Sequence, residues 1–183
     1  MIEFGTNGLL PPYLGVRTER VGYSPHLFTL PEVVELLGYT GARRGLLRRL
    51  LTVRAELHAA GVRRGEQWLA GSFVERTELT RDREPQDLDL VTLFGQHDPL
   101  VYRRLMQRIP QFQDPAAMQE RFGLDAYYFR RPDGSDDSLD DLLYWSAFFS
   151  HTTQNVWKGY VRVLLNLEEA LDAQAVRDLN SRG

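Results

Sequence analysis

Hydrophobic residues recur at helical spacing along the segment from about Ala42 to Ala60. The repeating positions are three or four residues apart: Leu46, Leu50, Val53 and Leu57. Residues at this spacing share one face of a helix. The pattern therefore predicts a long helix that packs this face on a core.

Other segments also show the spacing or the end signals of helices. Thr29–Gly38 has a capping-type threonine, a proline near the first turn and a closing glycine, which together predict a short helix. Four more segments are predicted to be helical: Pro99–Phe112, Ala116–Phe122, Leu139–Phe149 and Leu167–Leu179.

Four shorter apolar or alternating runs predict strands. They are Gln67–Ala70, Leu88–Phe94, Gly123–Arg130 and Lys158–Leu165. Residues 1–30 are rich in glycine, proline and tyrosine, which favours an extended N-terminal arm. Strands separated by helices indicate a mixed α/β (α+β) fold, with a central sheet and flanking helices in one domain over residues 1–183.

The net charge and the amino-acid composition argue against several classes of function. The net charge of −3 argues against a protein that binds nucleic acid or a membrane surface over its whole area. The chain has no cysteine, which excludes thiolate metal sites and favours a reducing compartment. No segment looks like a signal peptide or a membrane span, so a cytoplasmic location without membrane contact is expected.

Two aspartates stand one residue apart at the start of a predicted strand. Because alternate residues of a strand face the same side, Asp87 and Asp89 project together, with Cβ atoms about 6–7 Å apart. Their oxygens suit hard divalent cations such as Mg²⁺ or Mn²⁺. The alternative is that Asp87 ends a loop and Asp89 faces solvent.

A glycine and a serine follow the strand that precedes these aspartates. Gly71 lets the backbone approach a phosphate closely, and Ser72 offers a hydroxyl donor and a cap for a following helix. The pair would hold a triphosphate beside metal bound by the aspartates. Taken alone, it is equally well explained as a glycine turn followed by a helix cap.

Three further features are candidates for the same site. Asp125, within the run GLDAYYFRR, would supply a third carboxylate from a neighbouring strand, or else pair with Arg130. Lys158 would contact phosphate, or else lie exposed at a strand end. Several arginines flank the apolar stripe of the long helix. One of them, Arg44, would bind a triphosphate or a nucleic acid, or else these arginines form a solvated face. Aromatic residues of the later segments fit the core, although one of them would suit stacking on a nucleobase: Tyr127, Tyr128, Trp145 and Phe148.

The order of these features resembles the DNA polymerase beta-like nucleotidyltransferase superfamily. The resemblance rests on Gly71-Ser72, on the run Asp87-Leu88-Asp89 and on the later Asp125. The spacing between Ser72 and Asp87 is longer than in compact members. The chain also resembles a small bacterial branch of that superfamily at NGLLPP, GSFV and FFSHTTQNVWKGYVRVLL.

The resemblance implies a nucleotidyltransferase that uses two magnesium ions and a nucleoside triphosphate, such as ATP. Asp87, Asp89 and Asp125 would hold metal, with Asp125 accepting a proton, and Gly71 and Ser72 would hold phosphates. The acceptor would be a hydroxyl of a protein, a nucleic acid or a nucleotide. It further implies a setting in toxin–antitoxin or antiviral defence systems.

Two alternatives stay open at this level. One is a degenerate fold of the same type that binds a nucleotide or a partner protein without turnover, in a homo- or hetero-oligomer. The other is an antitoxin-like interaction protein in which Asp87 and Asp89 pair with arginines of the long helix.

Overall fold

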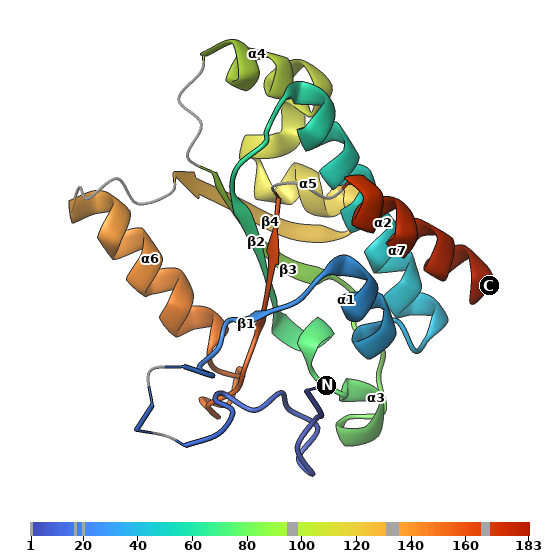
Figure 1. Cartoon of the computed structure of the whole chain (residues 1–183), viewed down its shortest axis with the longest axis vertical. Helices are drawn as coiled ribbons and strands as arrows, with labels where there is room; N and C mark the ends of the chain where they lie inside the picture. Colours follow the sequence, from blue (N-terminus) through green and yellow to red (C-terminus); the bar gives the residue numbers. More distant parts are fainter. Residues whose placement is uncertain (1, 17, 20, 95–98, 131–135, 166–168) are drawn as a thin grey trace.

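The computed structural model describes all residues except 1, 17, 20, 95–98, 131–135 and 166–168. Within that part of the chain, one mixed sheet of five strands has the order β1-β5-β2-β3-β4 (Figure 1). The strands are β1 (His26–Leu27), β2 (Glu66–Ala70), β3 (Leu88–Phe94), β4 (Leu124–Arg130) and β5 (Val161–Leu164). Strand β2 runs antiparallel to both β3 and β5, whereas β1 is parallel to β5 and β4 is parallel to β3. The prediction of a mixed α/β fold with a central sheet is confirmed.

Seven α-helices and two 3₁₀ helices accompany the sheet in the described residues. They are α1 (Leu30–Leu37), α2 (Gly41–Ala60), η1 (Gly71–Val74), α3 (Thr77–Thr80), α4 (Pro99–Arg108), η2 (Pro110–Gln113), α5 (Pro115–Phe122), α6 (Asp136–Phe149) and α7 (Glu169–Ser181). Both early helix predictions hold. Thr29 and Glu32 form the capping box of α1, and Gly61 ends α2 in a left-handed conformation.

Several predicted boundaries are wrong for identifiable reasons. The predicted arm over residues 1–30 contains the edge strand β1, which pairs with β5. The helix expected over Pro99–Phe112 ends at Arg108, because Pro110 cannot continue it and starts η2 instead. Gly123 belongs to the left-handed end of α5 rather than to β4. Lys158 precedes β5 and does not lie within it. The first residues of the helix predicted from Leu167 lie outside the described part of the chain.

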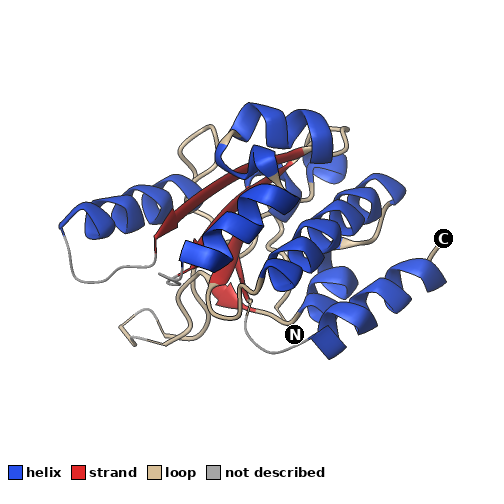
Figure 2. Cartoon of the chain, turned by 90° about the horizontal axis from the view of Figure 1, so that it is seen from above, coloured by secondary structure: helices blue, strands red, loops and turns tan. Residues whose placement is uncertain are grey.

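The two faces of the sheet bury different sets of side chains. The larger core contains Leu69, Leu88 and Leu90, together with the apolar faces of α1, α2, α4, α5 and α7. The smaller core lies on the opposite face, where Trp68, Val91 and Phe129 pack against α6. Seen from above, most helices gather along one side of the sheet while α6 stands apart at the other (Figure 2). Odd-numbered residues of β3 and β4 therefore face α6.

Two buried arginines of α2 connect separate elements of the fold through side-chain hydrogen bonds. Arg54 donates to Asp172 of α7 and to the side chain of Gln67 in β2. Arg43 donates to the Phe73 carbonyl at 2.6 Å, to the Glu75 carbonyl and to the Glu78 carboxylate. Arg43 thereby joins α2 to η1 and to the segment that follows it.

The ion pair between Arg43 and Glu78 predicts that part of the protein's stability is lost in acid. Burial raises the pKa of Glu78, but hydrogen bonds from Arg43, from backbone and from Tyr39 outweigh it and lower the pKa to about 2. The stabilisation is complete above pH 4.5, the ordinary pKa of this group, and is lost as the pH falls toward 2. Urea unfolding at pH 6, 4 and 3 should show that Glu78→Gln loses stability at pH 6 and that its deficit shrinks in acid. A constant deficit would contradict this, and Glu35→Gln, at an exposed position of α1, is the control.

The N-terminal arm lies against segments that come much later in the chain. The Gly8 carbonyl accepts from the Arg76 amide, and the Leu10 carbonyl accepts from the Gly159 amide at 2.7 Å. A Cβ at Gly159 would lie only 2.3 Å from the Pro11 carbonyl oxygen, so only glycine permits this contact. The runs NGLLPP and WKGY are therefore parts of one packed unit. Within the described residues, none of the helices combines the length and apolar character needed to cross a membrane.

Candidate functional site

Strands β3 and β4 bring two of the predicted aspartates side by side. Asp89 of β3 is in register with Asp125 of β4, and on its other side with Ala70 of β2. Registered residues of parallel strands point to the same face, here the face covered by α6. Asp87 stands just before β3 and accepts a hydrogen bond from Gln119 of α5 at 3.0 Å. The three acids thus gather at one end of the sheet, as the sequence predicted.

The three carboxylates repel one another electrostatically. Burial raises the pKa of Asp89 to about 6, the charges of Asp87 and Asp125 act in the same direction, and Lys158 opposes them. Burial also raises the pKa of Asp125, against a hydrogen bond from Tyr127 and with a further rise caused by Asp87. Such mutual repulsion is typical of groups arranged to bind a cation or to exchange a proton.

Gly71 makes the close approach between β2 and β3 possible. It has a left-handed backbone with φ of 65°, and a Cβ placed on it would lie 1.7 Å from Asp89 Oδ2 and 2.4 Å from Asp89 Cγ. The peptide at the end of β2 therefore lies directly against the Asp89 carboxylate. This contact joins the two ends of the run from Gly71 to Phe94 into one site.

Gly71→Ala should therefore damage both the fold and the position of Asp89. A left-handed alanine costs about 1–2 kcal/mol in free energy of unfolding, and displacement of the carboxylate adds to that loss. Gly45→Ala is the matched control, since no atom lies within 4 Å of its Cβ and helical alanine is favoured over glycine. Urea unfolding of both variants measures the difference. Equal stabilities would show that Gly71 does not constrain Asp89.

Ser72 differs in detail from the prediction. The segment after β2 is a single 3₁₀ turn, η1, whose cap position is Ala70, and Ser72 lies inside it without capping a longer helix. Its backbone carbonyl accepts from the Glu75 amide at 3.2 Å. The Ser72 side chain lines a cavity of about 720 Å³ that also contacts Asp89. Its place beside the aspartates is as predicted, whereas its capping role is wrong.

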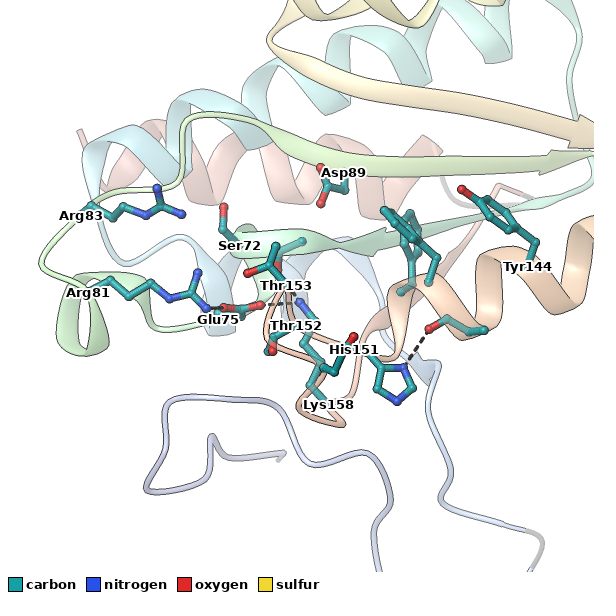
Figure 3. Close-up of a pocket in the computed structure, with 15 residues that line it drawn as sticks. Ser72, Glu75, Arg81, Arg83, Asp89, Tyr144, His151, Thr152, Thr153 and Lys158 are labelled. Atoms are coloured by element: carbon teal, nitrogen blue, oxygen red, sulfur yellow. Dashed lines mark hydrogen bonds and ion pairs between the residues drawn. The ribbon is translucent and has the colours of Figure 1, made fainter.

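The cavity beside Ser72 has a basic end that sequence reasoning did not find. Arg81 and Arg83, from the polar insert after α3, line it together with Glu75 and Lys158. Figure 3 shows these two arginines on one side of Asp89 and Tyr144 of α6 on the other. The cavity therefore runs from cationic side chains, past the carboxylates, to aromatic ones.

Lys158 is buried beneath this cavity, with only 1% of its surface exposed. Its ammonium donates to the Gly71 carbonyl at 2.9 Å and to Glu75 Oε1 at 2.6 Å (Figure 3). Arg81 pairs with the other oxygen of Glu75 at 3.0 Å. These bonds indicate that Lys158 holds the turn that contains Gly71, and the alternative of an exposed strand-end lysine is wrong.

Arg44 does not join the site. Its side chain donates to the carbonyls of Gly38 and Gly183 and is not among the residues that line the 720 Å³ cavity. The structure therefore does not bring Arg44 together with the aspartates, because the first turn of α2 directs this side chain toward Gly183. The bonds shown for Arg43, Arg44 and Arg48 also lead to partners other than Asp87 and Asp89.

The three aspartates suit a hard divalent cation, although their side chains are not already arranged as a complete set of metal ligands. In the described parts of the chain, no three acidic or histidine side chains already converge as ligands of one ion. The three groups still fit a cation, because all are oxygen donors and a cation would offset both the burial of Asp89 and the charges of Asp87 and Asp125 that raise its pKa. Magnesium commonly takes one or two carboxylates and completes its shell with water and substrate phosphates.

Comparison with known proteins gives one match. A family model described as a family of unknown function, DUF6932, matches residues 2–164. No curated protein and no solved structure matches the chain. The matched residues include the arm, the Gly71-Ser72 turn, all five strands and the three aspartates, and the chain belongs to the DUF6932 family.

Proposed function

We propose that this protein is a metal-dependent nucleotidyltransferase that moves a nucleoside monophosphate from a nucleoside triphosphate to a hydroxyl acceptor. The observation that carries the proposal is the contact of Gly71 with Asp89, which is itself in register with Asp125. The Gly-Ser turn thereby lies against the Asp89 carboxylate, beside the cavity of about 720 Å³ that both line. A nucleotidyltransferase-type fold is part of the same proposal, supported by the strand order around β2, β3 and β4.

Each part of the cavity has a distinct task in this proposal. Asp87, Asp89 and Asp125 hold divalent metal, which when bound offsets the negative charge that develops during phosphoryl transfer. Ser72, Arg81 and Arg83 bind the β- and γ-phosphates, because hydroxyl and guanidinium donors suit phosphate oxygens. Lys158 and Glu75 also line the cavity, and their hydrogen bonds position the turn that contains Gly71.

The transfer itself is an in-line displacement. The acceptor oxygen bonds to the α-phosphorus while the bond from that phosphorus to the bridging oxygen of the β-phosphate breaks, and pyrophosphate leaves with the electron pair. The hydroxyl proton needs a base. Asp125 suits that task, because its carboxylate lies in register with Asp89 on the neighbouring strand.

Nucleotide binding tests the basic end of the cavity separately from turnover. Arg83 is exposed at the cavity and should contact the triphosphate, so Arg83→Ala should weaken binding of a nucleoside triphosphate with magnesium about tenfold or more. Arg64→Ala is the matched control, since Arg64 is also exposed but precedes β2 at the other end of that strand. Calorimetric titration with each nucleoside triphosphate measures both. Equal affinities of the two variants would remove Arg83 from the proposed site.

A further inference from the structure

A second, smaller cavity opens on the Asp125 side of Asp89. Its volume is about 150 Å³, and among its walls are Asp89, Asp125, Tyr127, Tyr144, Trp145 and Phe148. Cavities that enclose drug-sized ligands are larger, roughly 300–1,000 Å³. This space therefore suits one chemical group of a ligand rather than a whole molecule.

The aromatic walls form a connected set of rings at the edge of α6. The centroids of Tyr127 and Trp145 are 4.7 Å apart, and Tyr144 meets Trp145 edge-on at 5.1 Å. The ring of Phe148 is nearly parallel to that of Tyr144, with an angle of 11° between the planes. Tyr144 and Phe148 are each 58% exposed and stack on one another, so together they present an exposed aromatic patch.

The electrostatic character of this cavity is anionic. None of the described residues that line it is basic, and two of them are the carboxylates Asp89 and Asp125. Asp140 and Asp141 are exposed one turn earlier on α6, on the approach to Tyr144. Lys158 is committed to Glu75 and Gly71 on the other side of Asp89. In the metal-free protein, such surroundings attract cations and repel phosphodiester groups.

In-line geometry fixes which reactant occupies this cavity. The attacking oxygen approaches the α-phosphorus from the side opposite the leaving pyrophosphate. If Arg81 and Arg83 bind the β- and γ-phosphates, the acceptor enters from the opposite side of Asp89, where Tyr144 stands (Figure 3). The aromatic cavity is therefore the acceptor side of the proposed reaction.

Resting on the proposed function, we infer that the acceptor is a hydroxyl-bearing organic cation whose ammonium group lies against Tyr144, Trp145 and Phe148. Aromatic faces attract ammonium groups, most strongly where several rings surround the charge. A nucleic-acid strand, with one negative charge per nucleotide, is the acceptor that this end of the cleft suits least.

A matched pair of small molecules tests the inference without nucleotide or metal. 2-Hydroxyethyl-trimethylammonium and its uncharged carbon isostere, 3,3-dimethylbutan-1-ol, have the same shape and differ in charge. NMR titration of the full chain should show that the cation binds at least about fivefold more tightly than the isostere. A phosphodiester dinucleotide should bind more weakly than the cation.

Variants at exposed positions locate the binding. Tyr144→Ala and Phe148→Ala should abolish the preference for the cation, whereas Tyr144→Phe should keep it because the ring face remains. Leu143→Ala is the matched control, because Leu143 is 59% exposed on the same helix and lines neither cavity. Thermal melting checks that each variant is folded.

Three results would overturn the inference. The first is that the isostere binds as tightly as the cation. The second is that the dinucleotide binds more tightly than the cation and loses this affinity in Tyr144→Ala. The third is that Leu143→Ala loses the preference for the cation as fully as Tyr144→Ala does. The proposed function is judged separately by nucleotide transfer. If the cation binds but no nucleotide is transferred, the proposed nucleotidyltransferase activity is refuted and the cation site stands. If nucleotide is transferred but the cation does not bind, the activity stands and the inferred acceptor is refuted.

Discussion

Asp89→Asn should abolish nucleotide transfer and, in the absence of divalent metal, make the protein more stable. The activity loss is expected to be on the order of 10³-fold or more, because the variant removes a central anionic ligand of the divalent metal. Transfer of labelled nucleotide measures it. Glu35→Gln, at an exposed site far along the chain from the aspartates, should retain wild-type activity.

The stability gain follows from the sign of the pKa shift. Asp89 has a folded pKa of about 6 against an ordinary value of 3.8, so the fold favours its protonated form. Its ionisation costs nothing below pH 3.8 and destabilises the fold increasingly until the pH passes 6. A shift of about two units corresponds to an upper limit of about 3 kcal/mol in the free energy of unfolding.

Urea unfolding in the presence of a chelator should therefore give Asp89→Asn a higher free energy of unfolding than wild type at pH 7.5. At pH 3.5 the two free energies should be nearly equal. A variant less stable than wild type at pH 7.5 would mean that Asp89 supports the fold instead of serving a ligand. Residues that lower stability in the free protein are typical of binding and catalytic sites.

The second large effect is expected from Lys158→Met. The substitution removes the ammonium that donates to Glu75 and Gly71, and it leaves Glu75, which is 3% exposed, with Arg81 as its charged partner. Removal of one member of a buried ion pair typically costs about 3–5 kcal/mol in free energy of unfolding. Urea unfolding near neutral pH measures the loss.

Two further variants separate this effect from a general loss of charge. Arg108→Met breaks the exposed pair with Glu56 and should cost less than about 1 kcal/mol. The double variant Lys158→Met/Glu75→Gln should recover part of the lost stability, because position 75 then no longer carries a buried negative charge. The account of Lys158 as a buried support fails if Lys158→Met is no worse than Arg108→Met.

Periodicity in the sequence predicted most of the secondary structure. The stripe of Leu46, Leu50, Val53 and Leu57 is buried in α2, and the run that contains Asp87 and Asp89 leads into a strand as predicted. The placement of Asp125 beside Asp89 followed from the expectation of neighbouring strands. These features depend on local patterns, which a single sequence displays.

The parts of the site that sequence reasoning missed depend on contacts between distant segments. Glu75 looks like any other acid in a polar insert, and its burial follows from Lys158, 83 residues later. Arg44 lies away from the cavity, whereas Arg43, three residues before Leu46, shares the buried face of α2 and supports η1 from below. Phe148 was named only among aromatic residues that fit the core or could stack on a nucleobase, and Tyr144 was missed, because exposed and buried aromatic residues alternate within α6.

Transfer of a nucleoside monophosphate is the central claim, and one measurement tests it most directly. Wild-type protein and the variant Asp87→Asn/Asp89→Asn are incubated with each labelled nucleoside triphosphate, magnesium or manganese, and candidate acceptors that include 2-hydroxyethyl-trimethylammonium, an oligonucleotide and the protein itself. Mass spectrometry of protein and small molecules, with a pyrophosphate assay, identifies the products. The account predicts pyrophosphate and a nucleotidylated acceptor from wild type alone. Equal product from the double variant, or nucleotide binding by wild type without pyrophosphate under every condition, would contradict it.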